Sequence, residues 1–402
     1  MDINEIIFLI QTPLTARDYA RFGVERLTRR GFKVSILDLT DILNPRYNRA
    51  HAGGAIPYSH YTVVYSRDGL TDFFMDRNFS RSLMMDLTGR RDLQILLGPH
   101  YRRCDINLAT LCVNSQPSLR SWKSPVLFPA ELAGKVIRGT VKGVLEFGRA
   151  PYVPQWVIAG ASADVKNFPK TPIRVIWAHC LDYDLYLEYQ SQKNDRMIPH
   201  DYAVLLDEYF PFHPDYRLKG VPANPFPDPM EYYHEINQML SQFEKKTGLG
   251  VVIAAHPRSE YDDKPDFFQG RRVVKGQTIE LVAHARCVLA HTSTSMNFAV
   301  LFEKPIAFLL CGRMKKHFYG RLITEMARQF NTSPVDLQSI DRWDVERTLS
   351  VDLKSHRTYR EMYIKRDGTP GKFFWDIFAD EVLKTGTNQT RQDPAGELIP
   401  AG

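Results

Sequence analysis

A histidine followed by proline stands at the end of an apolar run in the second half of the chain. His256 and Pro257 follow residues 250–254, which have the composition of a buried strand, and Arg258 comes next. The proline ring restricts the backbone of the histidine before it, and such a histidine can donate a hydrogen bond to a phosphate group. A surface loop with a turn proline would show the same pair, so both interpretations stay open here.

A run of hydroxyl side chains follows another apolar run. The run comes after residues 286–290 and leads into an apolar segment that predicts a helix; its members are Thr292, Ser293, Thr294 and Ser295. The first backbone N–H groups of a helix lack partners within it and the helix dipole is positive there, so the segment suits a phosphate or diphosphate. An N-cap would need only one of these hydroxyls. The segment therefore predicts an anion-binding loop.

A loop between these two segments enters a further predicted helix. Lys275 and Gly276 precede Thr278 and Glu280. The glycine would let the backbone approach a nucleotide base, and the two polar side chains could cap the helix or reach ribose hydroxyls. Plain helix capping explains Thr278 equally well.

Carboxylates follow two other apolar runs. Asp207 comes directly after residues 203–206, and Asp182 and Asp184 come soon after residues 173–177. A carboxylate in a partly buried cleft can act as base or nucleophile, although an aspartate in a turn often only accepts backbone N–H bonds. We expect at least one of the three to be catalytic, with Asp207 as the first candidate.

All these segments depend on strands whose carboxyl ends meet at one edge of a parallel sheet. Apolar runs predict a second α/β domain over residues 172–330, with its first strand at 173–177. Open sheets of this kind bind ligands at the carboxyl edge. The candidate residues are therefore expected to share one site.

The first part of the chain predicts another α/β domain. Residues 5–10 and 32–39 are strands on either side of a helix that ends at Gly31, which makes a βαβ unit. Further apolar runs indicate a doubly wound parallel sheet within residues 1–165. Residues 160–172 predict the connection, and the two domains are expected to enclose a cleft.

The rest of the chain is expected to be helical and then irregular. The 402 residues suffice for two or three domains. Residues 331–384 predict a helical segment that packs back toward the first domain. Residues 385–402, rich in Thr, Asn, Gln, Pro and Gly, predict a disordered tail.

Missing motifs exclude several functional classes. No GxxxxGK[ST] motif occurs and no GxGxxG motif follows the first strand, which argues against an ATPase or an ordinary NAD-dependent dehydrogenase. The five cysteines lack CxxC spacing and no HExxH motif occurs, so we expect no metal site. A net charge of +6 without a nucleic-acid motif favours small anionic partners over DNA or RNA.

Three segments, taken in order, resemble the donor half of bacterial, sialyltransferase-like GT-B glycosyltransferases that use CMP-sugars. They are His256-Pro257, Lys275-Gly276-x-Thr278-x-Glu280-Leu281, and His291-Thr-Ser-Thr-Ser with Glu303-Lys304-Pro305. Two more stretches look like the retaining β-Kdo transferases of surface polysaccharide assembly, namely His179-x-x-Asp182-Tyr183-Asp184 and Leu206-Asp207-Glu208 with His213-Pro214-Asp215. The resemblance covers about residues 170–310, and the first domain only in general layout.

The resemblance implies a GT-B glycosyltransferase that moves the acidic sugar Kdo from CMP-Kdo to a glycan acceptor, with retention through a carboxylate nucleophile. It implies that His256 and the hydroxyls of residues 293–295 hold the CMP phosphate. It also implies that the backbone of Lys275 and Gly276 contacts cytosine and that Asp207 faces the anomeric carbon. No cofactor or metal is implied, because hydrogen bonds from His, Ser, Thr and Lys side chains and from a helix N-terminus can replace a metal at the phosphate.

The resemblance further implies lipopolysaccharide O-antigen or capsule assembly, with a glycan acceptor that is lipid-linked. No run of eighteen apolar residues occurs and the chain start lacks a secretory signal, so we expect a cytoplasmic protein. The basic and aromatic residues 313–319 predict a weak peripheral contact with the anionic inner membrane.

Two alternatives stay open. One is an inverting sialyltransferase or a UDP-sugar GT-B transferase, and the other is a non-catalytic protein that binds nucleotide sugars or glycans. The chain departs from the sialyltransferases because no clear Asp/Glu-Asp/Glu-Gly base motif occurs in the first domain. Glu131 and Glu146 are the candidate acids there.

Overall fold

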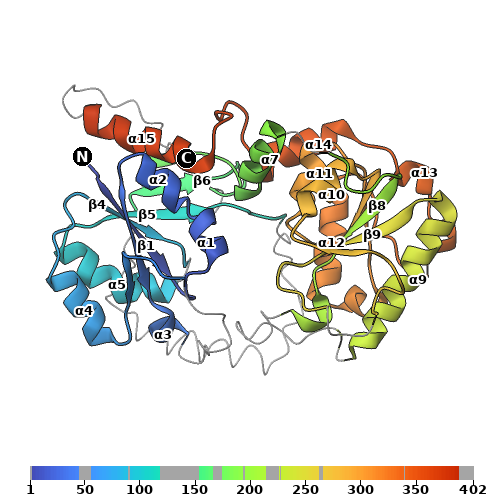
Figure 1. Ribbon diagram of the computed structural model, residues 1–402, viewed down its shortest axis with the longest axis horizontal. Coiled ribbons are helices and arrows are strands. Elements are labelled where there is room, and N and C mark those ends of the chain that lie inside the picture. Colours follow the sequence, from blue (N-terminus) through green and yellow to red (C-terminus); the bar gives the residue numbers. More distant parts are fainter. Residues whose placement is uncertain are drawn as a thin grey trace, which may run out of the picture.

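The computed structural model describes residues 2–44, 56–88, 91–117, 154–165, 174–192, 195–213, 226, 228–261, 266–338 and 340–388. Within these residues the chain forms two parallel sheets that lie side by side, each covered by helices (Figure 1). The predicted fold class, α/β with two Rossmann-like domains, is confirmed.

The first sheet has seven strands in the order β3-β2-β1-β4-β5-β6-β7, and every pair is parallel. The strands are β1 (Glu5–Ile10), β2 (Lys33–Asp38), β3 (Tyr61–Val63), β4 (Ser82–Asp86), β5 (Asn107–Cys112), β6 (Trp156–Ala159) and β7 (Arg174–Trp177). The helices between them are α1 (Ala16–Arg21), α2 (Val24–Arg29), α3 (Thr40–Leu43), α4 (Arg67–Met75) and α5 (Arg91–Arg103). The central strands are almost entirely buried, which is why their sequences are apolar without alternation.

Strand β7 corrects the predicted domain organisation. We expected residues 173–177 to open the second domain, but β7 pairs with β6 at the edge of the first sheet, with Arg174 opposite Trp156. The apolar run correctly predicted a strand. It contains no information on which sheet the strand joins, because both edges offer the same backbone partners.

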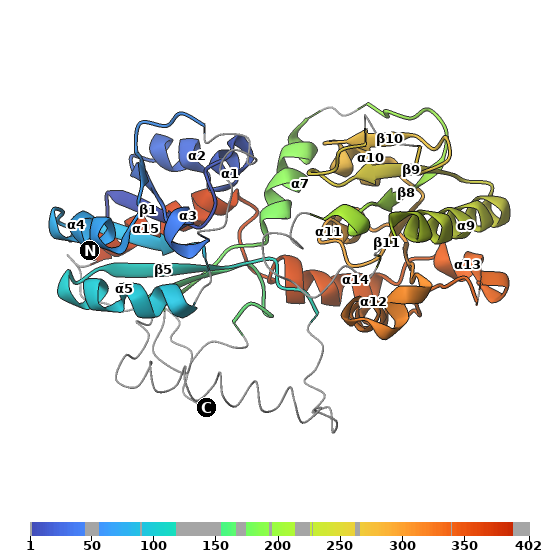
Figure 2. The ribbon, with the colours of Figure 1, turned by 90° about the horizontal axis from the view of Figure 1, so that it is seen from below.

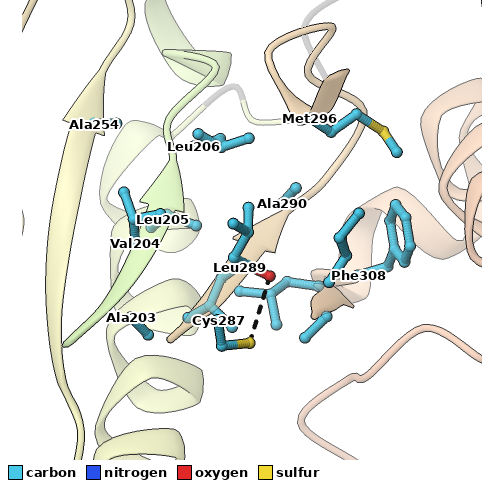
Figure 3. Packing of buried hydrophobic residues seen from close by; sticks show 14 of the residues in the cluster. Ala203, Val204, Leu205, Leu206, Ala254, Cys287, Leu289, Ala290, Met296 and Phe308 are labelled. Atoms are coloured by element: carbon cyan, nitrogen blue, oxygen red, sulfur yellow. Dashed lines mark hydrogen bonds between the residues drawn. The ribbon is translucent and has the colours of Figure 1, made fainter. Parts of the chain in front are cut away.

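The second sheet has five parallel strands in the order β10-β9-β8-β11-β12. The strands are β8 (Tyr202–Leu206), β9 (Gly250–Ala255), β10 (Val273–Lys275), β11 (Cys287–Ala290) and β12 (Ile306–Phe308). The helices of this domain include α7 (Leu181–Ser191), α9 (Pro229–Thr247), α10 (Thr278–His284), α11 (Met296–Leu301) and α12 (Phe318–Gln329). Side chains of β8, β11 and β12 pack together with Met296 in its core (Figure 3).

The C-terminal segment contacts both domains. Helices α13 (Val345–Thr348) and α14 (Leu353–Tyr359) lie on the second domain, and α15 (Phe374–Asn388) covers the first (Figures 1 and 2). Trp375 of α15 is buried in the first core, where its ring packs edge-on against Phe8. A Cβ at Gly23 would lie 2.1 Å from this indole, so position 23 requires glycine. Helix α15 also continues past the predicted end at residue 384, and residues 389–402 of the predicted tail lie outside the described residues.

Removal of the Trp375 side chain is expected to destabilise the first domain. Trp375 is 1% exposed and its indole N–H donates a 2.8 Å hydrogen bond to the carbonyl oxygen of Arg21. Trp375→Ala should therefore lower the free energy of unfolding by about 3–5 kcal/mol in urea denaturation followed by circular dichroism. Phe318→Ala is the control, because that ring is 48% exposed. Equal effects of the two substitutions would contradict the assigned role of Trp375.

Candidate active site

The carboxyl edges of the two sheets face each other. Gln116 follows β5 in the first domain, and its side-chain amide donates a 2.9 Å hydrogen bond to the carbonyl oxygen of Thr292, which follows β11 in the second. Arg17, in the helix after β1, lies close enough to Arg258, after β9, for their charges to interact. Both contacts join loops that follow parallel strands, so the edges that bind ligands in such sheets point to one region.

Each sheet has a point where the strand order reverses. This switch point lies between β1 and β4 in the first sheet and between β8 and β11 in the second. Ligands of open α/β sheets bind outside the carboxyl ends of the strands at such points. The residues that directly follow these strands are therefore the first candidates for a site.

Glu208 joins the two loops at the switch point of the second sheet. It follows β8, and its carboxylate accepts hydrogen bonds from the backbone N–H and the hydroxyl of Thr292 at 2.5 and 2.7 Å. Burial raises the pKa of Glu208 to about 7, although the hydrogen bonds from Thr292 favour the charged form. Glu208 thus holds the loop that carries Ser293. In the sequence we named Glu208 only as part of the Leu206-Asp207-Glu208 stretch and gave it no role, because only the fold brings it to Thr292.

Asp207, the first predicted nucleophile, has both carboxylate oxygens occupied. It is 4% exposed. Its Oδ1 accepts a 2.9 Å hydrogen bond from the N–H of Tyr209, and its Oδ2 accepts bonds from the N–H of His256 at 3.3 Å and the hydroxyl of Tyr261 at 2.8 Å. Burial raises the Asp207 pKa and these donors oppose the rise. The structure shows a carboxylate that ties the β8 and β9 loops together, and its nucleophilic role stays a prediction.

His256 presents a donor at the same edge of the second sheet. Its Nδ1 accepts a 3.2 Å hydrogen bond from the backbone N–H of Arg258, which assigns the ring proton of the neutral form to Nε2. The ring packs against His213 with a centroid separation of 4.9 Å. The Arg258 side chain itself is exposed. This arrangement is one that can donate to a phosphate.

The hydroxyl loop after β11 offers two side chains for a ligand. Ser293 Oγ accepts a 3.3 Å hydrogen bond from the N–H of Ser295, whereas the hydroxyls of Thr294 and Ser295 make no hydrogen bond to the described residues. His291, which starts the loop, is fully buried, with Nδ1 2.6 Å from the carbonyl oxygen of Leu309. Burial lowers the His291 pKa to about 4, so this histidine is a neutral core residue.

The loop after β10 is only partly brought to this edge. The Lys275 ammonium donates a 2.6 Å hydrogen bond to the carbonyl oxygen of Ser259 in the His256 loop. Gly276 has φ +81°, which favours glycine, and no heavy atom lies within 4 Å of a Cβ placed there. Thr278 starts α10 as its first residue. Glu280, two residues further, interacts with Tyr189 of α7, so it is not shown near the loops of His256 and Ser293.

Asp182 lies between the two domains. It is in the first turn of α7, where its Oδ2 accepts a 2.9 Å hydrogen bond from the side-chain amide of Asn297 in α11. Its Oδ1 accepts no hydrogen bond from the described residues. Burial raises the Asp182 pKa, and Asn297, Arg21 and Arg17 oppose the rise. Asp184 also has an oxygen, Oδ2, that accepts no hydrogen bond from the described residues. Of the three predicted acids, Asp182 is therefore singled out by its position beside Arg17 and Arg21.

Asp184 points away from this group and holds the C-terminal segment. Its Oδ1 accepts a 2.7 Å hydrogen bond from the N–H of Phe374 and lies 3.6 Å from Nε2 of His179. Burial raises the Asp184 pKa to about 7. These contacts describe a structural carboxylate, and a catalytic role for Asp184 stays a prediction.

Two arginines of the first domain complete the group and were missed in the sequence. Arg17 and Arg21 lie in α1, and neither forms an ion pair with a carboxylate of the described residues. Partial loss of solvent lowers the Arg17 pKa most, and the like charges of Arg21 and Arg258 lower it further. The carboxylates of Asp18 and Asp182 oppose this fall. Arginine still stays protonated, so three cations meet two carboxylates here. The available signal was their position in the helix directly after β1.

Some predicted residues cannot be placed. Glu131, Glu146, Pro214 and Asp215 lie outside the described residues.

Within the described chain, no group of three or more His, Cys, Asp or Glu residues is arranged to hold a metal ion. No helix in that part is both long and apolar enough to cross a membrane.

The basic segment 313–319 is partly neutralised by its surroundings. Arg313 pairs with Glu231, and Lys315 pairs with Asp336 at 3.0 Å. A hollow of about 330 Å³ lies beside the segment, lined by Gly312, Arg313, Lys316 and His317. Peripheral contact with a membrane through this segment stays a prediction.

Comparison with known proteins gives a distant likeness. No protein-family model and no curated protein matches the chain. Among solved structures, a UDP-GlcNAc 2-epimerase from Methanocaldococcus jannaschii has a TM-score of 0.46 at 11% identity, covering 95% of this chain and 99% of that one. The glycosyltransferase SnogD from Streptomyces nogalater has a TM-score of 0.43 at 11% identity, covering 95% and 99%. The wall teichoic acid polymerase TagF has a TM-score of 0.45 at 8% identity, covering 98% and 91%. Likeness at this level carries no information about activity.

Titration of Glu208 is expected to make stability depend on pH. Because its pKa is raised from 4.5 to about 7, the folded state retains a proton that the unfolded state has lost between these values, and stability falls as pH rises through this window. Glu208→Gln has no such proton. The Tm of the variant minus that of the wild type should therefore increase from pH 4.5 to 7 and then level off. A difference that stays constant across this range would contradict the raised pKa.

Proposed function

We propose that this protein is a glycosyltransferase that transfers Kdo from CMP-Kdo to a glycan acceptor. The observation that supports it most is the excess positive charge between two facing carboxyl edges. Arg17 and Arg21 approach from the first domain, and the donors of the His256 loop and the loop of residues 293–295 approach from the second. The two-sheet arrangement is also the one that the GT-B resemblance implies.

The charge distribution suits a donor with two separate anionic groups. A CMP-sugar of this type carries a phosphate and a sugar carboxylate. Arginine binds both groups well, because its planar guanidinium donates parallel hydrogen bonds to paired oxygens. An anion between Arg17 and Arg258 would also relieve their mutual repulsion. A donor with no acidic sugar would use less of this charge.

The same groups can stabilise the departing CMP. As the bond to the anomeric carbon breaks, negative charge grows on the phosphate oxygen that leaves. The Nε2–H of His256, the hydroxyls of Thr294 and Ser295 and the arginines are fixed donors for such charge, and fixed donors are the main source of stabilisation in transfer reactions of this kind.

Asp182 is the carboxylate that we assign to the anomeric carbon. One of its oxygens has no donor in the described chain, and it lies beside the first-domain arginines. A carboxylate in this place can form a covalent glycosyl-enzyme or stabilise the oxocarbenium-like transition state. Asp207 is second, because attack would require it to release Tyr261 or Tyr209.

The acceptor that we propose is a lipid-linked glycan of lipopolysaccharide O-antigen or capsule assembly. Transfer of another sugar from a UDP donor, inverting transfer of sialic acid, and binding without catalysis are the competing functions. Release of CMP from CMP-Kdo without an acceptor separates them, because a binding protein releases none and a UDP-sugar enzyme cleaves another donor.

Loss of the first-domain charge is expected to weaken donor binding. Arg17→Ala should reduce affinity for CMP-Kdo by about 10- to 100-fold, the range for a hydrogen bond to a charged group. Arg29→Ala is the matched control, because Arg29 lies in α2 and pairs with Glu25 at 2.9 Å. Isothermal titration with CMP-Kdo, CMP and UDP measures both. Tighter binding of UDP than of CMP would refute the cytidine assignment.

The nucleophile is expected to carry the sugar when no acceptor is present. Intact-protein mass spectrometry after addition of CMP-Kdo should show one added Kdo mass in the wild type. Asp182→Ala should abolish this adduct, whereas Asp207→Asn should retain it with a lowered Tm, since the variant loses loop contacts. An adduct that is lost only in Asp207→Asn would return the role to Asp207.

A further inference from the structure

The tripeptide Asp-Leu-Thr occurs at the ends of the two strands that flank β1. Asp38-Leu39-Thr40 ends β2, and Asp86-Leu87-Thr88 ends β4. In both, one carboxylate oxygen accepts hydrogen bonds from the backbone N–H and the hydroxyl of the threonine two residues later. This turn explains the shared sequence, and it uses one oxygen of each aspartate.

The second oxygen distinguishes the two aspartates. Oδ2 of Asp38 accepts a hydrogen bond from the hydroxyl of Tyr61. Oδ2 of Asp86 accepts none from the described residues. Asp86 is nevertheless 2% exposed. Oδ2 is not among the fully buried side-chain atoms of the described residues that lack a partner, so it keeps contact with solvent. The turn therefore uses one oxygen of Asp86 and leaves the other accessible to a ligand.

Asp86 lies at the switch point of the first sheet. It pairs with Leu9 across β1 and β4, and the side-chain amide of Gln11, directly after β1, bonds to the carbonyl oxygen of Thr88 at 3.4 Å. The helix that carries Arg17 and Arg21 follows the same strand. Asp38 lies on the far side of β1, between it and β3. Asp86 therefore shares the ligand-binding edge with the first-domain arginines.

The carboxylates at the switch point of the second sheet have donors on all their oxygens. Both oxygens of Asp207 and both oxygens of Glu208 accept hydrogen bonds from neighbouring loops. Among the carboxylates that directly end or follow a switch-point strand in the described chain, Asp86 alone keeps an oxygen for a ligand. A donor held by the second domain leaves the first domain to supply the group that meets the acceptor.

We propose that Asp86 is the base that takes the proton from the acceptor hydroxyl, an inference that rests on the proposed glycosyl transfer. The hydroxyl proton passes to Oδ2 of Asp86 while the acceptor oxygen forms its bond to the anomeric carbon. The bond from that carbon to its leaving oxygen breaks, and the electron pair stays on that oxygen. The leaving oxygen belongs to the CMP phosphate in a direct displacement, or to Asp182 in the second of two displacements.

The test uses water as the acceptor, because water also has to lose a proton. Steady-state CMP release from CMP-Kdo over many turnovers, each of which ends with transfer to water, is measured for the wild type, Asp86→Asn and the matched control Asp38→Asn, with and without sodium azide. Asparagine keeps an oxygen for the turn but cannot accept the proton. We expect Asp86→Asn to slow CMP release by about 100-fold or more and to leave the CMP-induced rise in Tm unchanged. Azide, which has no proton to lose, should restore release in this variant, and Asp38→Asn should stay within about threefold of the wild type.

Two results would overturn the assignment of Asp86 while leaving the transferase intact. One is CMP release by Asp86→Asn within about threefold of the wild type, and the other is a loss that azide does not restore although CMP still raises Tm. Because all measurements are made below the Tm of each variant, instability of the turn does not mimic either result. If the wild type neither binds CMP nor cleaves CMP-Kdo, the proposed function is wrong, and the assignment of Asp86 as its base is wrong as well.

Discussion

The relative position of the two sheets depends on hydrogen bonds between the two chain crossings that connect the domains. The first crossing leads from β7 into α7, and the second leads from α14 to α15. Cys180 N–H donates to the carbonyl oxygen of Ile364 at 2.6 Å, His179 Nε2 lies 2.8 Å from the carbonyl oxygen of Lys372, and Asp184 accepts from Phe374 N–H. These buried contacts fix the orientation of the two carboxyl edges toward each other. A site made by loops of both domains requires this fixed orientation.

Most acids at the two edges serve the loops and not a ligand. Asp164, after β6, accepts hydrogen bonds from the N–H groups of Gly160, Ala161 and Ser115, and Asp207 and Glu208 do the same for the second domain. Loops at a sheet edge contain backbone N–H groups that no ladder satisfies, and a short carboxylate satisfies several at once. An acid at a strand end is thus weak support for catalysis until the partner of each oxygen is known.

The need to know the hydrogen-bond partner of each carboxylate oxygen also limits what the sequence could predict. Apolar runs located the strands and their ends, because burial on both faces demands such runs, and so the loops with His256 and Ser293 were correctly placed at a common edge. Which sheet β7 joins and which donors occupy Asp207 depend on contacts between distant residues. We prefer Asp182 to Asp207 as the catalytic carboxylate because of their hydrogen-bond donors. Asn297 donates to one oxygen of Asp182, whereas Tyr261 is one of several donors to Asp207. Neither contact leaves a local pattern in the sequence.

The C-terminal helix contributes to the site without belonging to it. Trp375 donates to the carbonyl oxygen of Arg21, at the last residue of α1, and its ring occupies the space that Gly23 leaves between α1 and α2. Arg17 and Arg21 are therefore held in place by a segment more than half the chain away in sequence. Since α15 begins directly after the hydrogen-bonded crossing at Lys372 and Phe374, one segment both orients the two domains and supports the cations between them. Anion binding and domain arrangement are coupled through these few contacts.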